Sequence, residues 1–279
     1  MKDKIVVVTG ATAGIGRVAA RELAAKGAQV WVISRNAEKC ASVAAEIRQK
    51  TGNSAVMHLA ADLSSQAQVR RAAAQLRETL PRIDVLLNNA GAIYDKRALS
   101  ADGIEMTWAL NHLSYFLFTN ELLPLLKAAP APRVVNVSSA AHLMARSGMQ
   151  WDDVQFARSY SGWRAYGQSK LANILFSNEL ARRAGLASNA LHPGSVSTGF
   201  GRNNKGLLWT LFDKASALFT INAEEGAKTS IFLASSPDVE GVSGQYFDKC
   251  KAVTPSSAAR DTAAAQRLWA MSEEMTAQG

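Results

Sequence analysis

The sequence IVVVTGATAGIG, residues 5–16, joins a short β-branched run to a glycine-rich turn and the start of a helical pattern. Residues 5–9 are apolar or β-branched and stop at Gly10, whereas the helical pattern opens near Gly14 and ends at 26–27. Glycines in such a turn let the backbone approach a pyrophosphate, whose charge a helix N-terminus favours. An ordinary strand-to-helix turn is the simpler alternative, but the order strand, glycines, helix predicts a dinucleotide-binding site.

The second predicted strand, residues 28–33, ends where a dinucleotide-binding protein selects its cofactor. An acidic residue there usually binds the ribose 2′-hydroxyl of NAD, whereas an arginine accommodates the 2′-phosphate of NADP. Ser34 and Arg35 follow this strand without an acid, and the planar guanidinium suits a phosphate. We therefore expect NADP rather than NAD, the alternative being a solvated arginine at a helix start. Arg17 either adds positive charge near the phosphates or belongs to the ordinary helix surface.

Strand and helix patterns alternate along the rest of the chain. The further predicted strands cover 55–60, 85–91, 133–139 and 244–247, and the further predicted helices cover 37–50, 103–118, 161–176, 223–234 and 258–275. This alternation predicts an α/β fold of the Rossmann type, a doubly wound parallel sheet flanked by helices on both faces. No linker, repeat or low-complexity tract divides residues 1–279, so a single domain is expected.

The composition fits a globular protein of 279 residues that is 48% hydrophobic and 19% charged, which is enough to bury a substantial core. The net charge is +8, but the basic residues are scattered and lack a nucleic-acid-binding signature, so no nucleic-acid partner is expected. No apolar run approaches the ~20 residues of a membrane span, and the N-terminus lacks a secretory pattern. Cys40 and Cys250 show no metal spacing. We therefore expect a cytoplasmic protein with free thiols, no stable membrane insertion and no metal.

Tyr166 and Lys170 lie four residues apart in a segment with helical apolar spacing. Four residues make about one helical turn, so both side chains leave the same face. A phenol has a pKa of about 10, and a nearby ammonium favours its anion, which would let Tyr166 act as an acid or base. An exposed helix pair is the commoner explanation of this spacing alone. Asn111 is also unusual, because asparagine is disfavoured inside an apolar helix.

Further candidate positions are two serines, an aspartate and a histidine. Ser138 and Ser139 end the strand over 133–139, at the carboxyl edge where ligands bind to open parallel sheets. Asp62 also follows a strand, and it either accepts a hydrogen bond from an adenine amino group or caps the next helix. Among the four dispersed histidines, His58 and His112 are interpreted as local packing. His142 either lines a pocket or packs, and packing is favoured.

As a set, the motifs resemble the short-chain dehydrogenase/reductase superfamily in their order, over nearly the whole chain. The motifs are TGATAGIG (9–16), DL (62–63), NNAG (88–91), Asn111, SS (138–139), YGQSK (166–170) and HPGSVSTG (192–199). The long interval between the serines and Tyr166, which contains WDD at 151–153, and the run YGQSKLANILF (166–176) are most similar to the retinol-dehydrogenase-like branch.

The resemblance implies a catalytic set and a cofactor site. Tyr166 would be the acid/base, and Lys170 would lower its pKa and bind the nicotinamide ribose. Ser139, chosen because the second serine usually has this role while Ser138 faces away, would bind the reacting oxygen. Asn111 would keep a water that relays protons to Lys170. The residues expected at the cofactor are Gly10, Thr12, Gly14, Ile15, Gly16, Ser34, Arg35, Asp62, Leu63, Asn88, Ala90, Gly91, Tyr166, Lys170, Pro193, Gly194, Val196 and Thr198.

The expected reaction is hydride transfer between a nicotinamide and a carbonyl or alcohol substrate, with the proton supplied or taken by Tyr166. The segment near 200–222 resembles a substrate lid, and apolar residues at helical spacing over 207–219 favour either a hydrophobic substrate or a helix packed on the core. The superfamily's paired subunits suggest a homodimer, which the long interval before Tyr166 would obstruct. The alternative function is a non-catalytic protein that binds NADP as a regulatory ligand.

Overall fold

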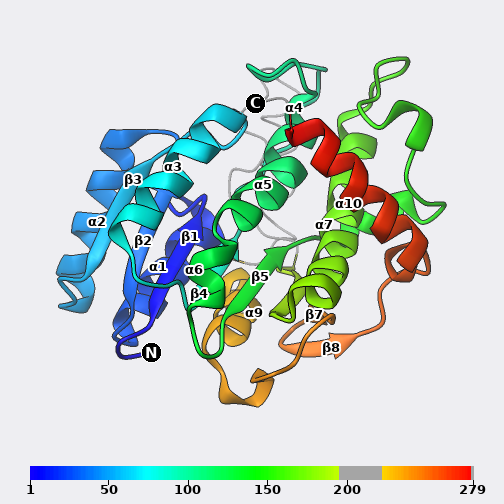
Figure 1. Ribbon diagram of the computed structural model, residues 1–279. Coiled ribbons are helices and arrows are strands. Elements are labelled where there is room, and N and C mark those ends of the chain that lie inside the picture. The colour runs from blue at the N-terminus through cyan, green and yellow to red at the C-terminus, as the bar shows by residue number, and fades with distance from the viewer. Residues whose placement is uncertain (195–221, 278–279) are drawn as a thin grey trace.

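The computed structural model describes residues 1–194 and 222–277. Within these ranges the strands form one eight-stranded sheet in the order β3-β2-β1-β4-β5-β6-β7-β8 (Figure 1). Neighbouring strands run parallel except β7 and β8, which are antiparallel. The strands are β1 (Ile5–Thr9), β2 (Gln29–Ser34), β3 (Val56–Ala60), β4 (Val85–Asn88), β5 (Arg133–Val137), β6 (Ala187–His192), β7 (Tyr246–Asp248) and β8 (Lys251–Val253). This topology confirms the predicted fold class.

Helices cover both faces of the sheet (Figure 1), with α1, α2 and α9 on one face and α3, α5 and α7 on the other. The α-helices are α1 (Gly14–Ala25), α2 (Ala37–Thr51), α3 (Gln66–Thr79), α4 (Met106–Trp108), α5 (Ser114–Glu121), α6 (Leu123–Lys127), α7 (Gly162–Ala184), α9 (Ala223–Ser235) and α10 (Thr262–Thr276). A π-helical turn is η1 (Ala109–Leu113), and the 3-10 helices are η2 (Ala140–Ala145), η3 (Trp151–Asp153), η4 (Pro237–Val239) and η5 (Ala258–Arg260).

The central strand β1 is buried on both faces. Ile5 and Val7 join the core beneath α3 and α5, whereas Val6 and Val8 pack with residues of α1 and α2. A parallel sheet covered on both sides needs apolar residues at every position of a central strand. The unbroken run over residues 5–9 therefore predicted β1 correctly.

The predicted helix over 103–118 is partly wrong. It begins only at Met106, because the Glu105 carboxylate accepts hydrogen bonds from the backbone N–H groups of Thr107 and Trp108 and so caps α4. The π-helical turn η1 then separates α4 from α5. Such single π turns are frequently found at functional sites, and this one contains Asn111.

A second difference lies at the end of the sheet. The strand expected over 244–247 is observed as β7, but a further strand, β8, pairs with it. Lys249 and Cys250 form the connection with positive φ angles of 48° and 60°. Hairpin turns of this kind usually contain Asn or Gly, so the sequence carries no hairpin signal here.

The C-terminal helix α10 packs along α7 (Figure 1). The ring of Trp269 stacks on Phe176 at 5.9 Å between centroids and meets Phe116 edge-on at 5.0 Å. These partners belong to α7 and α5. The C-terminal helix therefore covers part of the surface of both helices, and the expected homodimer stays a prediction.

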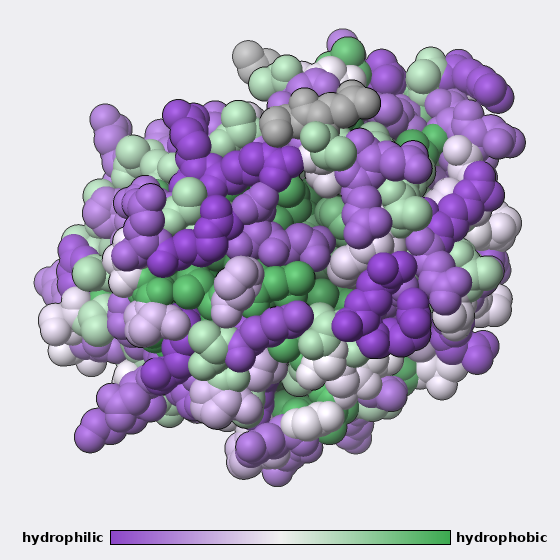
Figure 2. Space-filling model, viewed as in Figure 1, coloured by the Kyte–Doolittle hydropathy of each residue, from purple (hydrophilic) through white to green (hydrophobic). Residues whose placement is uncertain are grey.

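The viewed surface is largely hydrophilic, with apolar residues visible between the elements (Figure 2). Among residues 1–194 and 222–277, no helix combines the length and apolarity needed to cross a bilayer. Cys40 and Cys250 are both free thiols.

Candidate active site

The glycine turn after β1 packs directly against the loop after β4. Gly10 has a φ of 65°, and a Cβ there would lie 2.8 Å from the Cα of Ala90. A Cβ on Gly16 would lie 2.5 Å from the Gly10 carbonyl oxygen. No larger side chain fits at either position without moving backbone, so the turn presents main-chain groups beside the first turn of α1, where Gly14 and Ile15 lie. This arrangement fits a pyrophosphate at the helix N-terminus.

Asn89 and Thr9 hold these two loops together, although neither was predicted. The Asn89 amide donates to the Thr9 carbonyl at 2.9 Å, and the Thr9 hydroxyl accepts from the N–H groups of Asn89 and Ala90 at 2.9 and 3.0 Å. By contrast, Asn88 donates from inside the sheet to the hydroxyl of Thr119 at 2.9 Å. In the sequence, the available signal was a run of small polar residues at a strand end. That signal does not tell which of Asn88 and Asn89 joins the two loops.

The end of β2 meets the glycine turn through a pair of hydroxyl groups. Thr12 donates to Ser34 at 3.0 Å. Arg35 follows directly and lies near the Tyr94 hydroxyl, whose pKa is raised mainly by burial and is lowered in part by the charge of Arg35. Arg17 instead forms an ion pair with Glu46 of α2. It therefore lies at the contact between α1 and α2, whereas Thr12 and Ser34 pair at the end of β2.

At the end of β3, the Asp62 carboxylate caps the turn that leads into α3. It accepts hydrogen bonds from the Ser64 N–H at 3.0 Å and the Ser64 hydroxyl at 2.7 Å. Of the two readings of Asp62, the capping contact is the one present, and the adenine contact stays a prediction. Leu63 is buried next to it.

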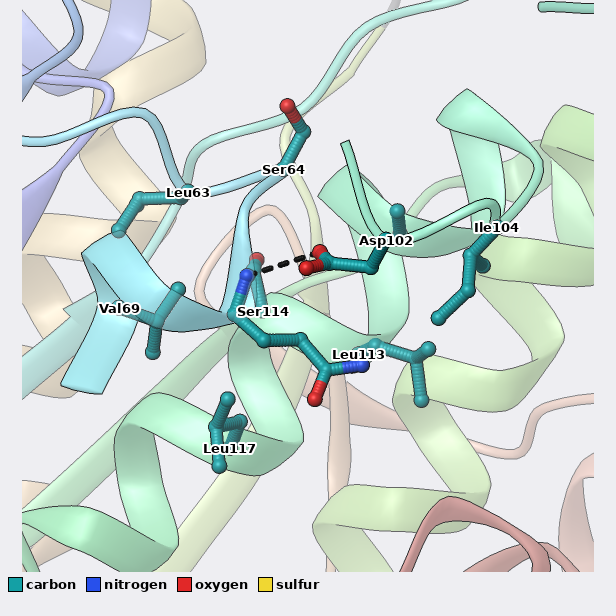
Figure 3. Close-up of a pocket in the computed structure, with 10 residues that line it drawn as sticks. Leu63, Ser64, Val69, Asp102, Ile104, Leu113, Ser114 and Leu117 are labelled. Atoms are coloured by element: carbon teal, nitrogen blue, oxygen red, sulfur yellow. Dashed lines mark hydrogen bonds between the residues drawn. The ribbon is translucent and has the colours of Figure 1, made fainter. Parts of the chain in front are cut away.

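A small cavity lies beneath this turn, between the start of α3 and the η1–α5 segment (Figure 3). Asp102 points toward the start of α3 and accepts a hydrogen bond from the Gln66 N–H at 2.9 Å. The lining residues are Leu63, Ser64, Gln66, Val69, Asp102, Ile104, Ala109, Leu113, Ser114 and Leu117. None of the expected catalytic residues lines this cavity, and Leu63 is the one lining residue that was expected at the cofactor.

The four expected catalytic residues converge at the carboxyl end of the sheet. A Cβ built on Gly91 would lie 3.2 Å from the Asn111 Oδ1 and 3.6 Å from the Lys170 Nζ. The Lys170 Nζ lies 5.5 Å from the centroid of the Tyr166 ring and donates to the Val137 carbonyl at 2.9 Å. α7 therefore places Tyr166 and Lys170 on one face beside the loop after β4.

The two serines after β5 have different environments. Ser138 is buried and donates to the Lys170 carbonyl at 2.7 Å, so it holds β5 to α7. Ser139 is only partly buried, accepts from the Ala141 N–H at 3.1 Å, and is hydrogen-bonded to the Tyr166 phenol. Ser139 is therefore the serine that faces the phenol.

Asn111 links three parts of the site from a fully buried position. Its Oδ1 accepts from the Ala92 N–H and its Nδ2 donates to the Ala92 carbonyl, both at 2.9 Å. The Nδ2 also donates to the Ser169 hydroxyl at 3.0 Å. These contacts explain how an asparagine is tolerated among hydrophobic residues, because its amide pairs with backbone outside its own helix.

Burial dominates the protonation of the reactive pair. It raises the pKa of Tyr166 to about 12, and the hydrogen bond with Ser139 acts in the opposite direction. Burial also lowers the pKa of Lys170 to about 7. We expected the Lys170 ammonium to lower the phenol's pKa. Within the polypeptide, desolvation outweighs any such effect, and Ser139 is the group that stabilises the phenolate.

The loop after β6 reaches the same edge of the sheet. Pro193 and Gly194 follow His192, and Gly194 has a φ of 87°. Val196 and Thr198, expected at the nicotinamide carboxamide, lie outside the described residues. So does the expected lid near 200–222, including 207–219. Among the residues that are described, no group of three or more His, Cys, Asp or Glu side chains is arranged to hold a metal.

Comparison with known proteins identifies relatives that are similar in sequence and in structure. A family model described as short chain dehydrogenase matches residues 4–151. Mouse retinol dehydrogenase 12 is 41% identical over 277 residues, covering 98% of this chain and 86% of that protein. A crystal structure of an uncharacterised protein from Mycobacterium paratuberculosis has a TM-score of 0.77 and 35% identity, covering 99% of this chain and 94% of that one.

A Shigella flexneri short chain dehydrogenase complexed with NADP has a TM-score of 0.68 and 27% identity, covering 90% of this chain and 98% of that one. Fold, site and relatives together define a Rossmann-type oxidoreductase that uses a nicotinamide cofactor. The chain belongs to the short-chain dehydrogenase/reductase superfamily, in its retinol-dehydrogenase-like branch.

Proposed function

We propose that the protein is an NADP(H)-dependent oxidoreductase that interconverts a hydrophobic carbonyl compound and its alcohol, with Tyr166 as the acid/base. The observation that carries this proposal is the convergence of Tyr166, Ser139 and Lys170 beside Gly91. Nicotinamide dinucleotides supply a hydride when bound. A carbonyl oxygen placed between the Ser139 hydroxyl and the Tyr166 phenol would then receive its proton from the phenol.

Lys170 and Asn111 would assist this proton transfer. The Lys170 Nζ lies close to the Tyr166 ring and near Gly91, where it would bind the ribose of the cofactor. With a pKa lowered to about 7, its amine would exchange protons readily at neutral pH. Asn111 would hold the proton-relaying water beside it, as the family resemblance implies.

The preference for NADP rests on Arg35, supported by the hydroxyl pair of Thr12 and Ser34 beside it. We expect Arg35→Asp to reduce the ratio of kcat/KM for NADPH over NADH by about 10–100-fold, because a charge-assisted phosphate contact becomes a repulsion. The ratio is measured with both cofactors at one substrate concentration. Lys50→Asp is the matched control, since it makes the same charge change at the far end of α2. An unchanged ratio in Arg35→Asp would refute the role of Arg35.

An exposed tryptophan beside the phenol and two exposed apolar side chains on η2 support a hydrophobic substrate. Trp163 is 42% exposed and meets the Tyr166 ring edge-on at 6.3 Å, while Leu143 and Met144 on η2 are 49% and 55% exposed. A Cβ on Gly167 would lie 3.0 Å from the Met144 Cβ, so η2 packs tightly on α7 at this point. Exposed apolar groups at the mouth of a site would bind the nonpolar part of a substrate.

Removing the Trp163 ring is expected to raise KM for a long-chain or polycyclic carbonyl about tenfold, because the apolar contact is lost. The KM of a two- or three-carbon aldehyde should change little. The measurement compares both substrates in Trp163→Ala. Met57→Ala, which removes an exposed apolar residue on β3, is the control. Equal changes for large and small substrates would show that Trp163 does not contact the substrate.

The proposed activity is tested by following NADPH absorbance with a panel of aldehydes and ketones, and NADP⁺ reduction with the matching alcohols. Turnover of at least one hydrophobic substrate is expected. If tight NADPH binding occurs without turnover of any of them, the regulatory alternative is favoured.

We also propose a cytoplasmic location, supported by the two free thiols. Recovery of the protein in a membrane or organelle fraction would contradict it.

A further inference from the structure

His142 lies in η2, three residues after Ser139, and only 3% of it is exposed. Its two ring nitrogens contact two different backbone segments. The Nδ1 lies 2.8 Å from the Ser139 carbonyl oxygen, and the Nε2 lies 3.3 Å from the Ser256 backbone nitrogen. A backbone N–H can only donate and a carbonyl can only accept. The contacts therefore define one neutral tautomer, in which the Nδ1–H donates to Ser139 and the Nε2 accepts from Ser256.

A second imidazole holds the same peptide unit from the other side. The Ala140 N–H donates to the Nδ1 of His192 at 3.2 Å. The carbonyl of Ser139 and the N–H of Ala140 belong to one planar peptide group. Both polar groups of the peptide that follows Ser139 are thus bound by histidine side chains from η2 and from the end of β6.

The surroundings of His142 favour a single orientation of its ring. Tyr246 of β7 meets it edge-on, with the ring centroids 5.2 Å apart. The Ser256 segment leads through η5 into α10. His142 is therefore held by the sheet on one side and by the C-terminal segment on the other, which makes it a rigid support for the turn that carries Ser139.

We propose that His142 is a positioning residue of the reaction, which orients the Ser139–Ala140 peptide so that the Ser139 hydroxyl faces Tyr166. This inference rests on the proposed function. Ser139 caps η2 by accepting from the Ala141 N–H, so its hydroxyl hydrogen remains available for the Tyr166 phenol or a substrate oxygen. Rotation of the Ser139–Ala140 peptide would move the Ser139 side chain away from both. His142 touches no reacting atom and acts only through Ser139.

Two conservative variants separate the two contacts of His142. The side-chain amide of asparagine reaches the position of Nδ1, so His142→Asn keeps a donor for the Ser139 carbonyl. The amide of glutamine reaches the position of Nε2, so His142→Gln keeps an acceptor for the Ser256 N–H and loses the contact with Ser139. We expect His142→Gln to lower kcat about 10–100-fold, because small displacements of a reacting group have effects of this size.

His142→Asn should stay within about threefold of the wild-type kcat, since the Ser139 contact persists. The KM for substrate and the Kd for NADPH should be nearly unchanged in both variants. His58→Gln, on exposed β3, is the control. A purely structural role would lower the melting temperature and kcat together and to the same degree in both variants. That result, or wild-type kcat in His142→Gln, would overturn the inference.

The tautomer gives a second readout that does not depend on turnover. Nitrogen-15 spectra of the histidine rings should show a proton on the Nδ1 of His142 and an accepting Nε2. The reverse tautomer would overturn the proposed orientation. If the wild-type protein shows no turnover while the expected tautomer is present, the proposed function fails and the catalytic part of this inference fails with it. Normal turnover in wild type and in His142→Gln overturns the inference alone.

Discussion

Tyr166→Phe lowers kcat/KM for carbonyl reduction by about 10²–10⁴-fold, the usual contribution of a general acid, while NADPH binding is retained. The phenol is 9% exposed and carries the hydroxyl that Ser139 contacts, and phenylalanine keeps the ring without the proton. Initial rates and a fluorescence titration of NADPH measure the two effects separately. A protein that used NADP only as a regulatory ligand would keep its function in this variant.

Tyr115→Phe is the matched control for the loss of a hydroxyl. Tyr115 is buried near the same lysine, with its ring centroid 5.8 Å from the Lys170 Nζ. Its hydroxyl has no hydrogen-bond partner among the described residues, so its removal should cost little stability. Activity close to wild type in Tyr115→Phe, with loss in Tyr166→Phe, assigns the effect to the reactive phenol. Comparable losses in both would contradict that assignment.

The pKa of the phenol also predicts how the two directions of the reaction respond to pH. Reduction needs the protonated phenol, which predominates at every pH well below the pKa of about 12. Oxidation needs the phenolate. At pH values below the pKa, the phenolate fraction increases about tenfold for each unit by which the pH rises. The reductive rate should therefore vary little between neutral and mildly alkaline pH, while the oxidative rate increases. A bound cofactor and a charged Lys170 would shift both profiles toward lower pH by favouring the anion.

Much of the fold could be predicted from local patterns. The apolar run of β1, the glycine turn and the start of α1 follow from residues 5–16 alone, because a buried parallel strand and a helix have different periodicities. The β7–β8 hairpin could not be predicted, because Lys249 and Cys250 adopt positive φ angles that their residue types do not signal. Here tertiary pairing outweighs the local preference.

The site shows the same division between local signal and tertiary contact. The spacing of Tyr166 and Lys170 placed both residues on one face of α7. The partners of Asn111 could not be inferred, since its contacts with Ala92 and Ser169 depend on how the β4 loop, η1 and α7 meet. Burial was likewise invisible, and it reverses the expected direction of the Tyr166 pKa shift.

Asn111→Leu should destabilise the protein by about 2–6 kcal/mol, because the buried N–H and carbonyl of Ala92 both lose their partner and each costs about 1–3 kcal/mol. For a chain of this size the melting temperature should fall by roughly 5–15 °C. Denaturant unfolding measures the free energy, and a thermal scan measures the temperature. Asn120→Leu is the control, since within the described part of the chain the Asn120 amide bonds only to the Phe116 carbonyl one turn earlier in its own helix. Its expected cost is below about 1 kcal/mol.

Asn111→Asp separates the structural contacts from any role in proton relay. A carboxylate would still accept from the Ala92 N–H, but it would face the Ala92 carbonyl oxygen without a hydrogen to share and would leave the Ser169 hydroxyl without its donor. Substantial destabilisation is therefore expected in this variant too. Wild-type stability in both Asn111 variants, with activity lost, would instead assign Asn111 to proton relay alone. Because the Ala92 backbone directly follows Gly91, loss of the amide should also weaken NADPH binding, which relay alone would not affect.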